Sequence, residues 1–502
     1  MYITHTNILG YEKQYKNYFI IYYKIMNIFL FNKGLRCNDN TTLIHMTKEL
    51  GDITPIFVFT EQVNKKKNEY FSNNSVEFMC ESLKDMADTI KDKYDGKLYF
   101  FHHDDIIKVL KNIHKTTNIA SLGTNFDYSP YALQRQQLLK EFCDKHNIVF
   151  IIKEDHVLHD ILDGMTNKDN GEPYTVFTPF KNHAIQTLKV REVDTFRSFK
   201  FAKHPILEKS KYYISQKDID SFYEPNPESF VKGGRTAGLK ILKNVGKYKD
   251  YKIMRDNLTY KTTYLASHNH FGTVSIREVY YNMKEKLKSK SIDIINELYW
   301  RDFYYNLYYN NQHMLNGMTG GKNKAFKPKF DHIKWKYDKV LFKRWCDGTL
   351  GIPVCDAGMR QMNRTGIMHN RLRMVTAAVL TKLCMLPWTW GEKYFAQTLK
   401  DYDCIQNGGG WAWTVTGVDP AQPFRIFSPK QQSLKFDPEC LFILEYIPEL
   451  KDVPIDCIHN WEETYTEYLD KGIQYYKPAI DYKKARVAYL DEINRVNKLP
   501  HN

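Results

Sequence analysis

The sequence has no closely spaced cysteine pairs. Its nine cysteines are scattered along 502 residues, and none forms a C-x-x-C pair or a spacing typical of zinc sites. Disulfide frameworks and structural zinc sites both need such spacing. We therefore expect free thiols, no bound metal, and a soluble protein in a reducing intracellular compartment such as the cytoplasm or nucleus.

Long hydrophobic runs are also absent, and no stretch is long enough to cross a membrane. The apolar run Tyr18–Tyr23 is followed at once by Lys24, and no small-residue cleavage site comes after it. A signal peptide is therefore not expected. Because a clean strand pattern begins at Met26, residues 1–25 are predicted to be an extension outside the fold.

Acidic residues are too few to balance the basic ones. The chain has 58 Asp and Glu against 72 Lys and Arg, which gives a formal net charge of +14. This charge suits a polyanionic partner, nucleic acid first and an anionic membrane second, whereas a merely Lys-rich surface is the simpler alternative. Aromatic residues make up 15% of the chain, and their mixture with basic residues favours nucleic acid.

A Gly-x-Gly-x-x-Gly dinucleotide fingerprint is missing after the first expected strand, and no internal repeat is found. Apolar runs nevertheless predict strands, separated by helical patterns, at residues 27–32, 53–60, 97–101, 119–123 and 148–153. Strands that alternate with helices in this way predict an α/β domain with a doubly wound parallel sheet covered on both faces.

The length of the chain requires more than one core, so further domains are expected. We place the α/β domain at residues 26–160 and a surface connector, rich in Pro and polar residues, at 161–230. Residues 231–495 are predicted to form an all-helical domain, with long amphipathic stretches at 291–309 and 357–385.

One stretch of the helical part, Asp401–Phe427, concentrates unusual residue types. It begins with Asp401 and Asp403, continues with Asn407 and three consecutive glycines, and then places Trp411 and Trp413 on either side of an alanine. Glycines free the backbone for positive φ or for close approach to a ligand. Two interpretations stay open here, a flat aromatic cofactor or a buried structural turn.

Two other helical faces carry candidate chemistry. Glu297, Trp300, Arg301 and Tyr304 follow i, i+3, i+4 and i+7 spacing, which places them on one face. That face is either a solvated ion-pair surface with a tryptophan anchor or a pocket that stacks a nucleobase.

The second face lies in the run Met368–Met374, where Asn370, Arg373 and Met374 share one side and Arg371 is expected to turn away. Two arginines near an amide suit phosphate or carboxylate partners. Asp401 or Asp403 is the expected counter-ion for Arg373.

Four motifs together resemble the DNA photolyase/cryptochrome family, and most closely its class I cyclobutane pyrimidine dimer photolyases. They are Glu-Leu-x-Trp-Arg-x-Phe-Tyr from Glu297, Asp-Ala-Gly-Met-Arg-Gln from Asp356, Met-His-Asn-Arg-Leu-Arg-Met from Met368, and the run from Asn407 to Phe427. The resemblance covers about residues 26–490. It implies an α/β antenna domain followed by a helical domain that holds a folded FAD.

The resemblance also implies residue roles. The FAD phosphates, ribityl chain, sugar and ring are expected at Tyr251, Thr262, Thr263, Leu265, Asn370, Arg373, Asp401, Tyr402 and Asp403, with Asn407 facing flavin N5. The flipped pyrimidine dimer is expected at Glu297, Trp300, Met374 and Trp413, and DNA or cofactor phosphates at Arg301, Tyr304, Asn370 and Arg371. Trp411, Trp388 and Trp335 match a tryptophan chain that carries electrons to the flavin.

By the same resemblance, the protein is expected to be a monomer that repairs thymine dimers in UV-damaged DNA, using light and reduced FAD. Some positions depart from the family pattern, namely Tyr264, Ala266, Ile294 and Ala412. Ala132 stands where folate-binding members carry Glu, so a folate antenna is not expected. A deazaflavin, another second chromophore, or none remains open.

Three alternatives also stay open. A (6-4) photolyase should show a histidine pair where this chain has His369 alone. A cryptochrome photoreceptor usually carries a long C-terminal extension, and this sequence stops soon after the core. The third alternative is a basic nucleic-acid-binding protein without enzyme activity.

Overall fold

The computed structural model describes residues 26–162, 165–167, 170–319, 322–418 and 424–499. The extension expected at residues 1–25 lies outside these described residues. A six-stranded sheet in the order β5-β4-β1-β2-β3-β6 forms the N-terminal part. Its strands are β1 Met26–Phe31, β2 Thr54–Phe59, β3 Tyr99–His102, β4 Ile119–Asn125, β5 Val149–Lys153 and β6 Tyr213–Ile214. The first five are parallel, which confirms the predicted α/β class.

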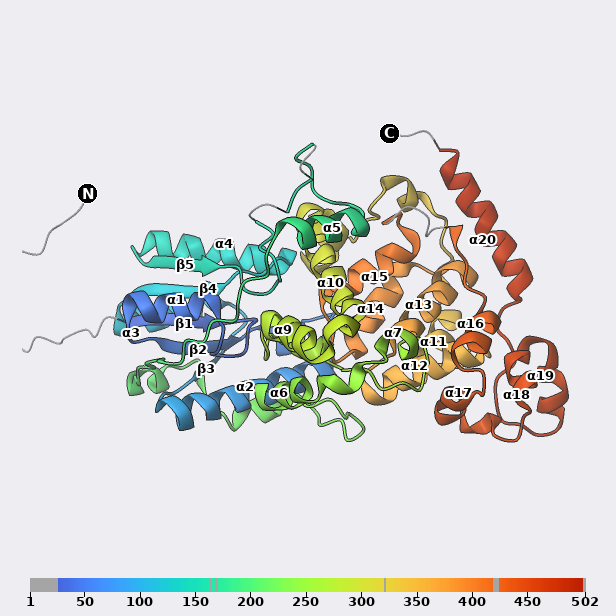
Figure 1. The fold of residues 1–502 in the computed structure, drawn as a ribbon, viewed down its shortest axis with the longest axis horizontal. Helices are drawn as coiled ribbons and strands as arrows, with labels where there is room; N and C mark the ends of the chain where they lie inside the picture. Colours follow the sequence, from blue (N-terminus) through green and yellow to red (C-terminus); the bar gives the residue numbers. More distant parts are fainter. Residues whose placement is uncertain (1–25, 163–164, 168–169, 320–321, 419–423, 500–502) are drawn as a thin grey trace, which may run out of the picture.

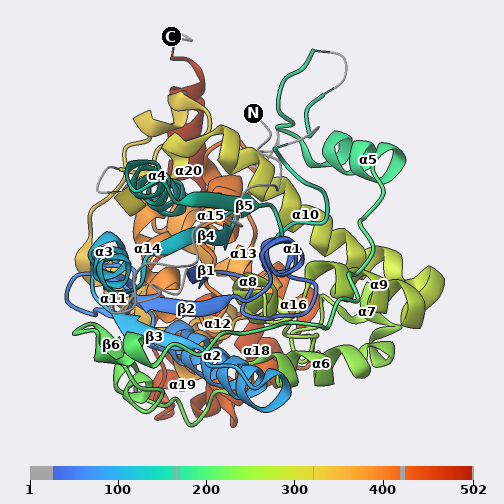
Figure 2. The same cartoon turned by 90° about the vertical axis from the view of Figure 1, so that its left-hand side faces the viewer.

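Helices cover both faces of this sheet, as Figures 1 and 2 show. The four helices are α1 Thr41–Leu50, α2 Asn73–Tyr94, α3 Ile106–Thr117 and α4 Pro130–Lys145. Side chains alternate along β1, so that Phe29 and Phe31 pack with α1 and α2, whereas Ile28 and Leu30 pack with α3 and α4. Because both faces are buried, the strands read as nearly continuous apolar runs.

The segment expected to be a surface connector is more ordered than its composition indicates. It contains helix α5, Phe177–Thr187, and strand β6, which pairs antiparallel with β3 at the sheet edge. Phe177, Phe180 and Ala184 are buried at helical spacing. Pro179 lies in the first turn of α5, where a missing N–H is tolerated, so this proline does not interrupt the helix.

The remaining chain is mostly helical, as expected, and occupies the right-hand side of Figure 1. Its helices are α6 Arg235–Lys243, α7 Tyr251–Met254, α8 Ala266–Phe271, α9 Ile276–Leu287, α10 Ile292–Asn310, α11 Lys339–Asp347, α12 Pro353–Thr365, α13 Asn370–Ala378, α14 Trp388–Thr398, α15 Cys404–Val415, α16 Pro429–Phe436, α17 Leu441–Tyr446, α18 Ile455–His459, α19 Trp461–Asp470 and α20 Tyr482–Asn497. None of the helices in the described ranges is long and apolar enough to span a membrane.

The amphipathic stretch 357–385 is divided between two helices. Helix α12 ends at Gly366, whose φ of +73° places it in the left-handed region, and α13 begins at Asn370. A Cβ at Gly366 would also lie 2.7 Å from the side chain of Asn74 in α2. A glycine therefore ends α12 where the helical part meets the α/β part.

Buried ion pairs join the sheet-bearing part to the helical part. Arg277 of α9 places its Nε 2.8 Å from Asp39 Oδ2 and its Nη2 2.8 Å from Asp155 Oδ1. Arg36 Nη2 lies 2.6 Å from Asp155 Oδ2. Burial would raise the pKa of Asp155, but the two guanidinium groups lower it to about 2. The cluster therefore stays fully charged and fixes how the two parts meet.

Replacing Arg277 with Ala should lower the free energy of unfolding by about 3–5 kcal/mol, because two buried carboxylates would lose a partner. Urea denaturation measures this directly. Lys48→Ala is the matched control, since it removes a cation from the exposed pair with Asp194 and should cost at most about 1 kcal/mol. Similar small losses in both variants would contradict the assignment of the buried cluster as an anchor.

Candidate functional site

The three consecutive glycines lie inside helix α15, which excludes the buried turn, one of the two interpretations left open by the sequence. None of the three has a positive φ. A Cβ on Gly409 would lie 2.4 Å from Tyr304 Cδ1, and one on Gly408 would lie 2.8 Å from Leu315 Cδ2. Gly408 and Gly409 therefore let α15 pack closely against α10, whereas a Cβ on Gly410 would have no neighbour within 4 Å among the described residues.

Asp403 caps the N-terminus of α15 and is fully engaged by the protein. Its Oδ1 accepts from the backbone N–H of Ile405 at 3.0 Å, while its Oδ2 accepts from Tyr305 and lies 2.9 Å from His270 Nδ1 and 3.6 Å from Lys33 Nζ. Burial alone would raise the pKa of Asp403, but Lys33, His270 and Tyr305 hold it well below its usual range. Protein donors thus reach both oxygens of Asp403, and a contact between this carboxylate and a cofactor stays a prediction.

Asp401 is the counter-ion of Arg373, one of the two pairings that the sequence predicted. Arg373 Nη2 lies 2.8 Å from Asp401 Oδ2 and 3.0 Å from Oδ1, and Arg373 Nε donates to the carbonyl of Met368. Asp401 is 8% exposed. Tyr402, the next residue, has a buried hydroxyl that has no hydrogen-bond partner in the described parts of the chain.

Asn407 is held by a carboxyl group that the sequence analysis did not single out. Its Nδ2 donates to the backbone carbonyl of Glu392 and to Glu392 Oε1, both at 3.0 Å. Because the amide nitrogen is used in this way, the amide oxygen is the group left to accept from a ligand. Glu392 is buried in α14, and its Oε2 finds no partner among the described residues.

Burial raises the pKa of Glu392 to about 7, from an ordinary value of 4.5. A raised folded-state pKa means that this group stabilises the fold at acid pH and that this contribution is lost as the pH rises from about 4.5 to about 7. Replacing Glu392 with Gln should remove that loss. Between pH 5 and pH 8, the free energy of unfolding of the variant should rise by roughly 2–3 kcal/mol relative to that of the unmodified protein. Denaturant titrations at the two pH values measure this difference. Parallel pH profiles would show that Glu392 is not a buried titrating group.

The four residues predicted to share one face of α10 differ in how far they are exposed. Glu297 is exposed and accepts from Arg255 Nη1 at 2.9 Å, while Trp300 and Tyr304 are half-buried. Arg301, in contrast, is 8% exposed and donates to the carbonyl of His156 at 2.8 Å. Its guanidinium is thus directed at protein acceptors, and a contact between Arg301 and DNA or cofactor phosphates stays a prediction. Helical spacing alone could not reveal that the Arg301 side chain is buried, because spacing does not show which side of the predicted face contacts the rest of the protein.

Helix α13 places its residues differently from the expectation. Arg371 does not turn away from Met374, because its Nη1 lies 3.7 Å from Met374 Sδ. Its Nη2 donates to Asp256 Oδ1 at 2.6 Å, and the guanidinium lies 4.5 Å from the ring centre of Phe436. Asn370 is exposed at the start of the helix.

The residues expected near the FAD phosphates lie in and after the short helix α7. Tyr251, Thr262 and Thr263 are half-buried, and Leu265 is 2% exposed. Tyr264 has a φ of +53°, which is rare for a residue other than glycine. The backbone of this loop is therefore held in a specific, tightly turned shape.

The three tryptophans of the expected electron chain share one hydrophobic cluster. Trp411 is 2% exposed and Trp388 5% exposed, whereas Trp335 is half-buried and packs against the cluster from outside. The ring of Trp411 lies 5.1 Å from Phe395 and 6.1 Å from Trp345. Trp413, expected at the lesion, is half-buried two positions further along α15.

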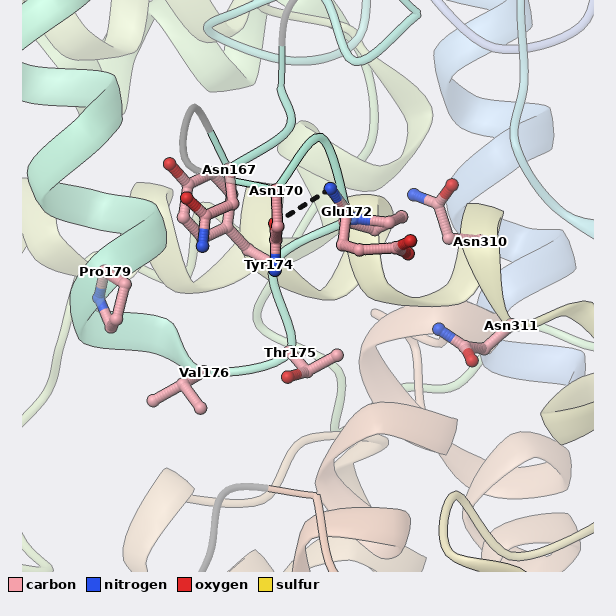
Figure 3. A pocket seen from close by; sticks show the side chains of 10 residues that line it. Asn167, Asn170, Glu172, Tyr174, Thr175, Val176, Pro179, Asn310 and Asn311 are labelled. Carbon is pink, nitrogen blue, oxygen red and sulfur yellow. Dashed lines mark hydrogen bonds between the residues drawn. The ribbon is translucent and has the colours of Figure 1, made fainter.

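Two cavities in the described parts of the chain are large enough to consider, and Tyr402 lines the first of them. One of about 260 Å³ sits beyond the carboxyl ends of the strands on both sides of β1, where open α/β sheets bind ligands. Its lining includes Lys33, Thr60, Asp127, Tyr131, Arg135, His270 and Tyr402. The other, of about 420 Å³, is open and polar, and Figure 3 shows it between the segment leading into α5 and the end of α10.

Comparison with known proteins agrees with this geometry. The family model for the FAD binding domain of DNA photolyase matches residues 294–495, and the DNA photolyase model matches residues 27–198. A deoxyribodipyrimidine photo-lyase of Buchnera aphidicola is 30% identical over 92% of this chain and 96% of its own length. The crystal structure of an archaeal photolyase from Sulfolobus tokodaii, described with two FAD molecules, has a TM-score of 0.81 at 30% identity and covers 94% of this chain and all of its own. A Synechocystis cryptochrome at 22% identity has a TM-score of 0.78, covers 93% of this chain and 98% of its own, and shows the shared fold.

The fold and the family match place the chain in a class of flavoproteins in which an α/β part is joined to a helical FAD-binding part. The chain belongs to the DNA photolyase family. Several buried polar atoms near the expected FAD residues lack a partner within the described ranges, among them Tyr402 Oη, Asn269 Oδ1 and Arg371 Nε. Donors and acceptors of this kind fit the sugar, phosphates and ring edge of FAD.

Proposed function

We propose that this protein repairs cyclobutane pyrimidine dimers in DNA, using light and reduced FAD. The observation that carries the proposal is the close packing of α10 on α15 through Gly408 and Gly409. That packing joins the helix with Glu297 and Trp300 to the helix with Asn407 and Trp413. Groups suited to a damaged base and groups suited to a flavin thus belong to one rigid unit.

Lesion binding requires the dimer to leave the duplex, because chemistry on a base needs it out of the stack. Unstacking costs a few kcal/mol, and less at a damaged step. Trp300 and Trp413 are half-buried indoles that would stack the flipped pyrimidines, which returns about 1–3 kcal/mol per base. Met374 would fill the remaining apolar space, and Glu297 would accept from the ring N–H groups.

Reduced FAD, if held by Arg373, Asp401 and Asn407, would supply the light-driven electron that opens the cyclobutane ring and would recover that electron after both bonds have broken. Asn407 would present its amide oxygen to flavin N5–H, since Glu392 holds the amide nitrogen. Arg373 and Asp401 would lie beside the ring as a neutral pair and add no net charge there. Trp335, Trp388 and Trp411 would feed electrons to oxidised FAD from the protein surface.

A (6-4) photolyase is less consistent with the site. Repair of a (6-4) product moves a hydroxyl group between rings and needs an acid. His369 Nδ1 accepts from the N–H of Arg371, and burial lowers the pKa of His369 to about 4. This histidine is therefore neutral at pH 7 and is used as a helix cap, which favours the cyclobutane lesion.

We also propose that residues 26–160 and 231–495 act as an antenna domain and a catalytic domain, joined by residues 161–230. The 260 Å³ cavity beyond β1 would then hold a second chromophore. Folate is not expected there, because Ala132 is 1% exposed and supplies no carboxylate.

A cryptochrome-type photoreceptor is the second candidate, and it shares this fold but would repair nothing.

Replacing Glu297 with Ala tests the proposal. We expect affinity for a dimer-containing duplex to fall about tenfold, because the lesion loses an acceptor worth about 1–2 kcal/mol. Flavin absorbance should be unchanged, and light-dependent repair should drop at subsaturating DNA. Glu285→Ala on α9 removes the same charge from an exposed position and should behave like the unmodified protein. Full repair by the Glu297 variant would rule out this site as the lesion site.

A further inference from the structure

The ring of Phe177 lies flat against the indole of Trp300. The two ring centres are 3.6 Å apart, and the planes differ by 8°. Phe177 is the first residue of α5 and is 8% exposed. One face of the Trp300 indole is therefore covered by a residue from the segment between the two domains.

Helix α5 is itself fixed against α10. Phe180 meets Phe303 edge to face, with ring centres 5.6 Å apart, and Phe177 meets the same ring at 5.9 Å. Asn306 Nδ2 donates to the carbonyl of Tyr174 at 3.4 Å, just before α5 begins. Figure 3 shows the segment from Tyr174 to Pro179 running beside the end of α10. Phe177 is thus a rigid backing for Trp300 and not a mobile lid.

An indole has two faces, and a base can stack only on a face that is free. Because Phe177 covers one face, a flipped pyrimidine can use only the opposite one. The stack also restrains the tilt of the indole, so the opposite face would already be oriented before DNA arrives. Pre-organisation of this kind raises affinity for the ligand without adding a contact to it.

We propose that Phe177 is a positioning residue for the lesion, which acts by holding Trp300 with a single face open to the flipped pyrimidine. The proposal rests on the proposed function, in which Trp300 stacks the dimer. It assigns a role in damage recognition to α5, which precedes the helical part that carries Trp300.

The test compares Phe177→Leu, Phe177→Tyr and Phe180→Leu. Dissociation constants are measured in the dark for a duplex with one cyclobutane dimer and for the same duplex undamaged, and repair per absorbed photon is measured at saturating DNA. We expect Phe177→Leu to weaken dimer binding about three- to tenfold, the range for loss of one aromatic stack. Undamaged binding, saturated repair and flavin absorbance should not change.

Phe177→Tyr should restore dimer affinity, since it keeps the stacked ring. Phe180→Leu should have no effect on dimer affinity, because Phe180 lies on the same helix but packs on Phe303. If both Leu variants lost the same affinity for the dimer, α5 would support the site only in general. If Phe177→Leu lost no affinity, Phe177 would have no stacking role. Either result overturns the inference. An unmodified protein that binds damaged and undamaged DNA equally would refute the proposed function itself, and the inference with it.

Discussion

Replacing Trp411 with Phe is expected to abolish light-driven reduction of oxidised flavin while leaving repair by chemically reduced protein intact. Phe fills most of the same space but is much harder to oxidise than Trp. Trp411 is 2% exposed, and its ring packs so closely on α14 that a Cβ at Gly391 would lie 2.1 Å from Trp411 Cη2. Helix α14 begins with Trp388, so Trp388 and Trp411 belong to two helices that pack against each other.

The measurement has two arms on the same preparation. Flavin absorbance is followed under blue light with an added thiol reductant, and dimer repair is followed after reduction with dithionite. Trp461→Phe is the matched control, since Trp461 is 1% exposed in the same hydrophobic cluster but lies in α19. Loss of repair in the chemically reduced Trp411 variant would show that this residue contacts the substrate or supports the site.

The second large effect is expected from replacing Arg373 with Ala, which should release FAD. The Asp401 side chain, which is 8% exposed in the intact protein, would lose its cation, and removing one partner of a charge pair that is largely withdrawn from water costs about 2–5 kcal/mol. If flavin binding bears this cost, affinity for FAD falls about 30-fold or more. The flavin content of the purified protein and an FAD titration of the stripped protein both measure it.

Arg360→Ala is the control for this variant. Arg360 Nη1 lies 2.7 Å from Glu449 Oε1, and both side chains are partly buried in the helical part. Its loss should destabilise the fold by a comparable amount but leave FAD bound. Equal loss of flavin from both variants would mean that general destabilisation, and not the Arg373–Asp401 pair, controls flavin binding.

The five parallel strands and their helix coverage were predictable from the sequence because both faces of the sheet are buried. Burial on both faces turns β1 and β2 into apolar runs, and each following helix carries its own capping residue, such as Asn40 or Ser72. The Arg373–Asp401 pair was also predictable as one of two options, because a buried guanidinium needs a carboxylate nearby.

What the sequence could not reveal depends on contacts between distant segments. Lys33 follows β1, and its approach to Asp403 joins residues 370 positions apart, so no local pattern signals it. Phe177 was assigned to a connector because its stacking partner, Trp300 on α10, is distant in the sequence and cannot be inferred from the local pattern. The glycines of α15 suggested a loop, since only the position of Tyr304 shows that they permit close helix packing.

The central claim is light-driven repair of the cyclobutane lesion, and one measurement tests it most directly. Two oligonucleotides of the same sequence, one with a thymine cyclobutane dimer and one with a (6-4) product, are mixed with reduced protein and illuminated, with a dark sample alongside. We predict that the cyclobutane strand is restored in the light only, and that the (6-4) strand is unchanged. Restoration of the (6-4) strand alone would contradict the substrate, and restoration of neither strand would favour a photoreceptor.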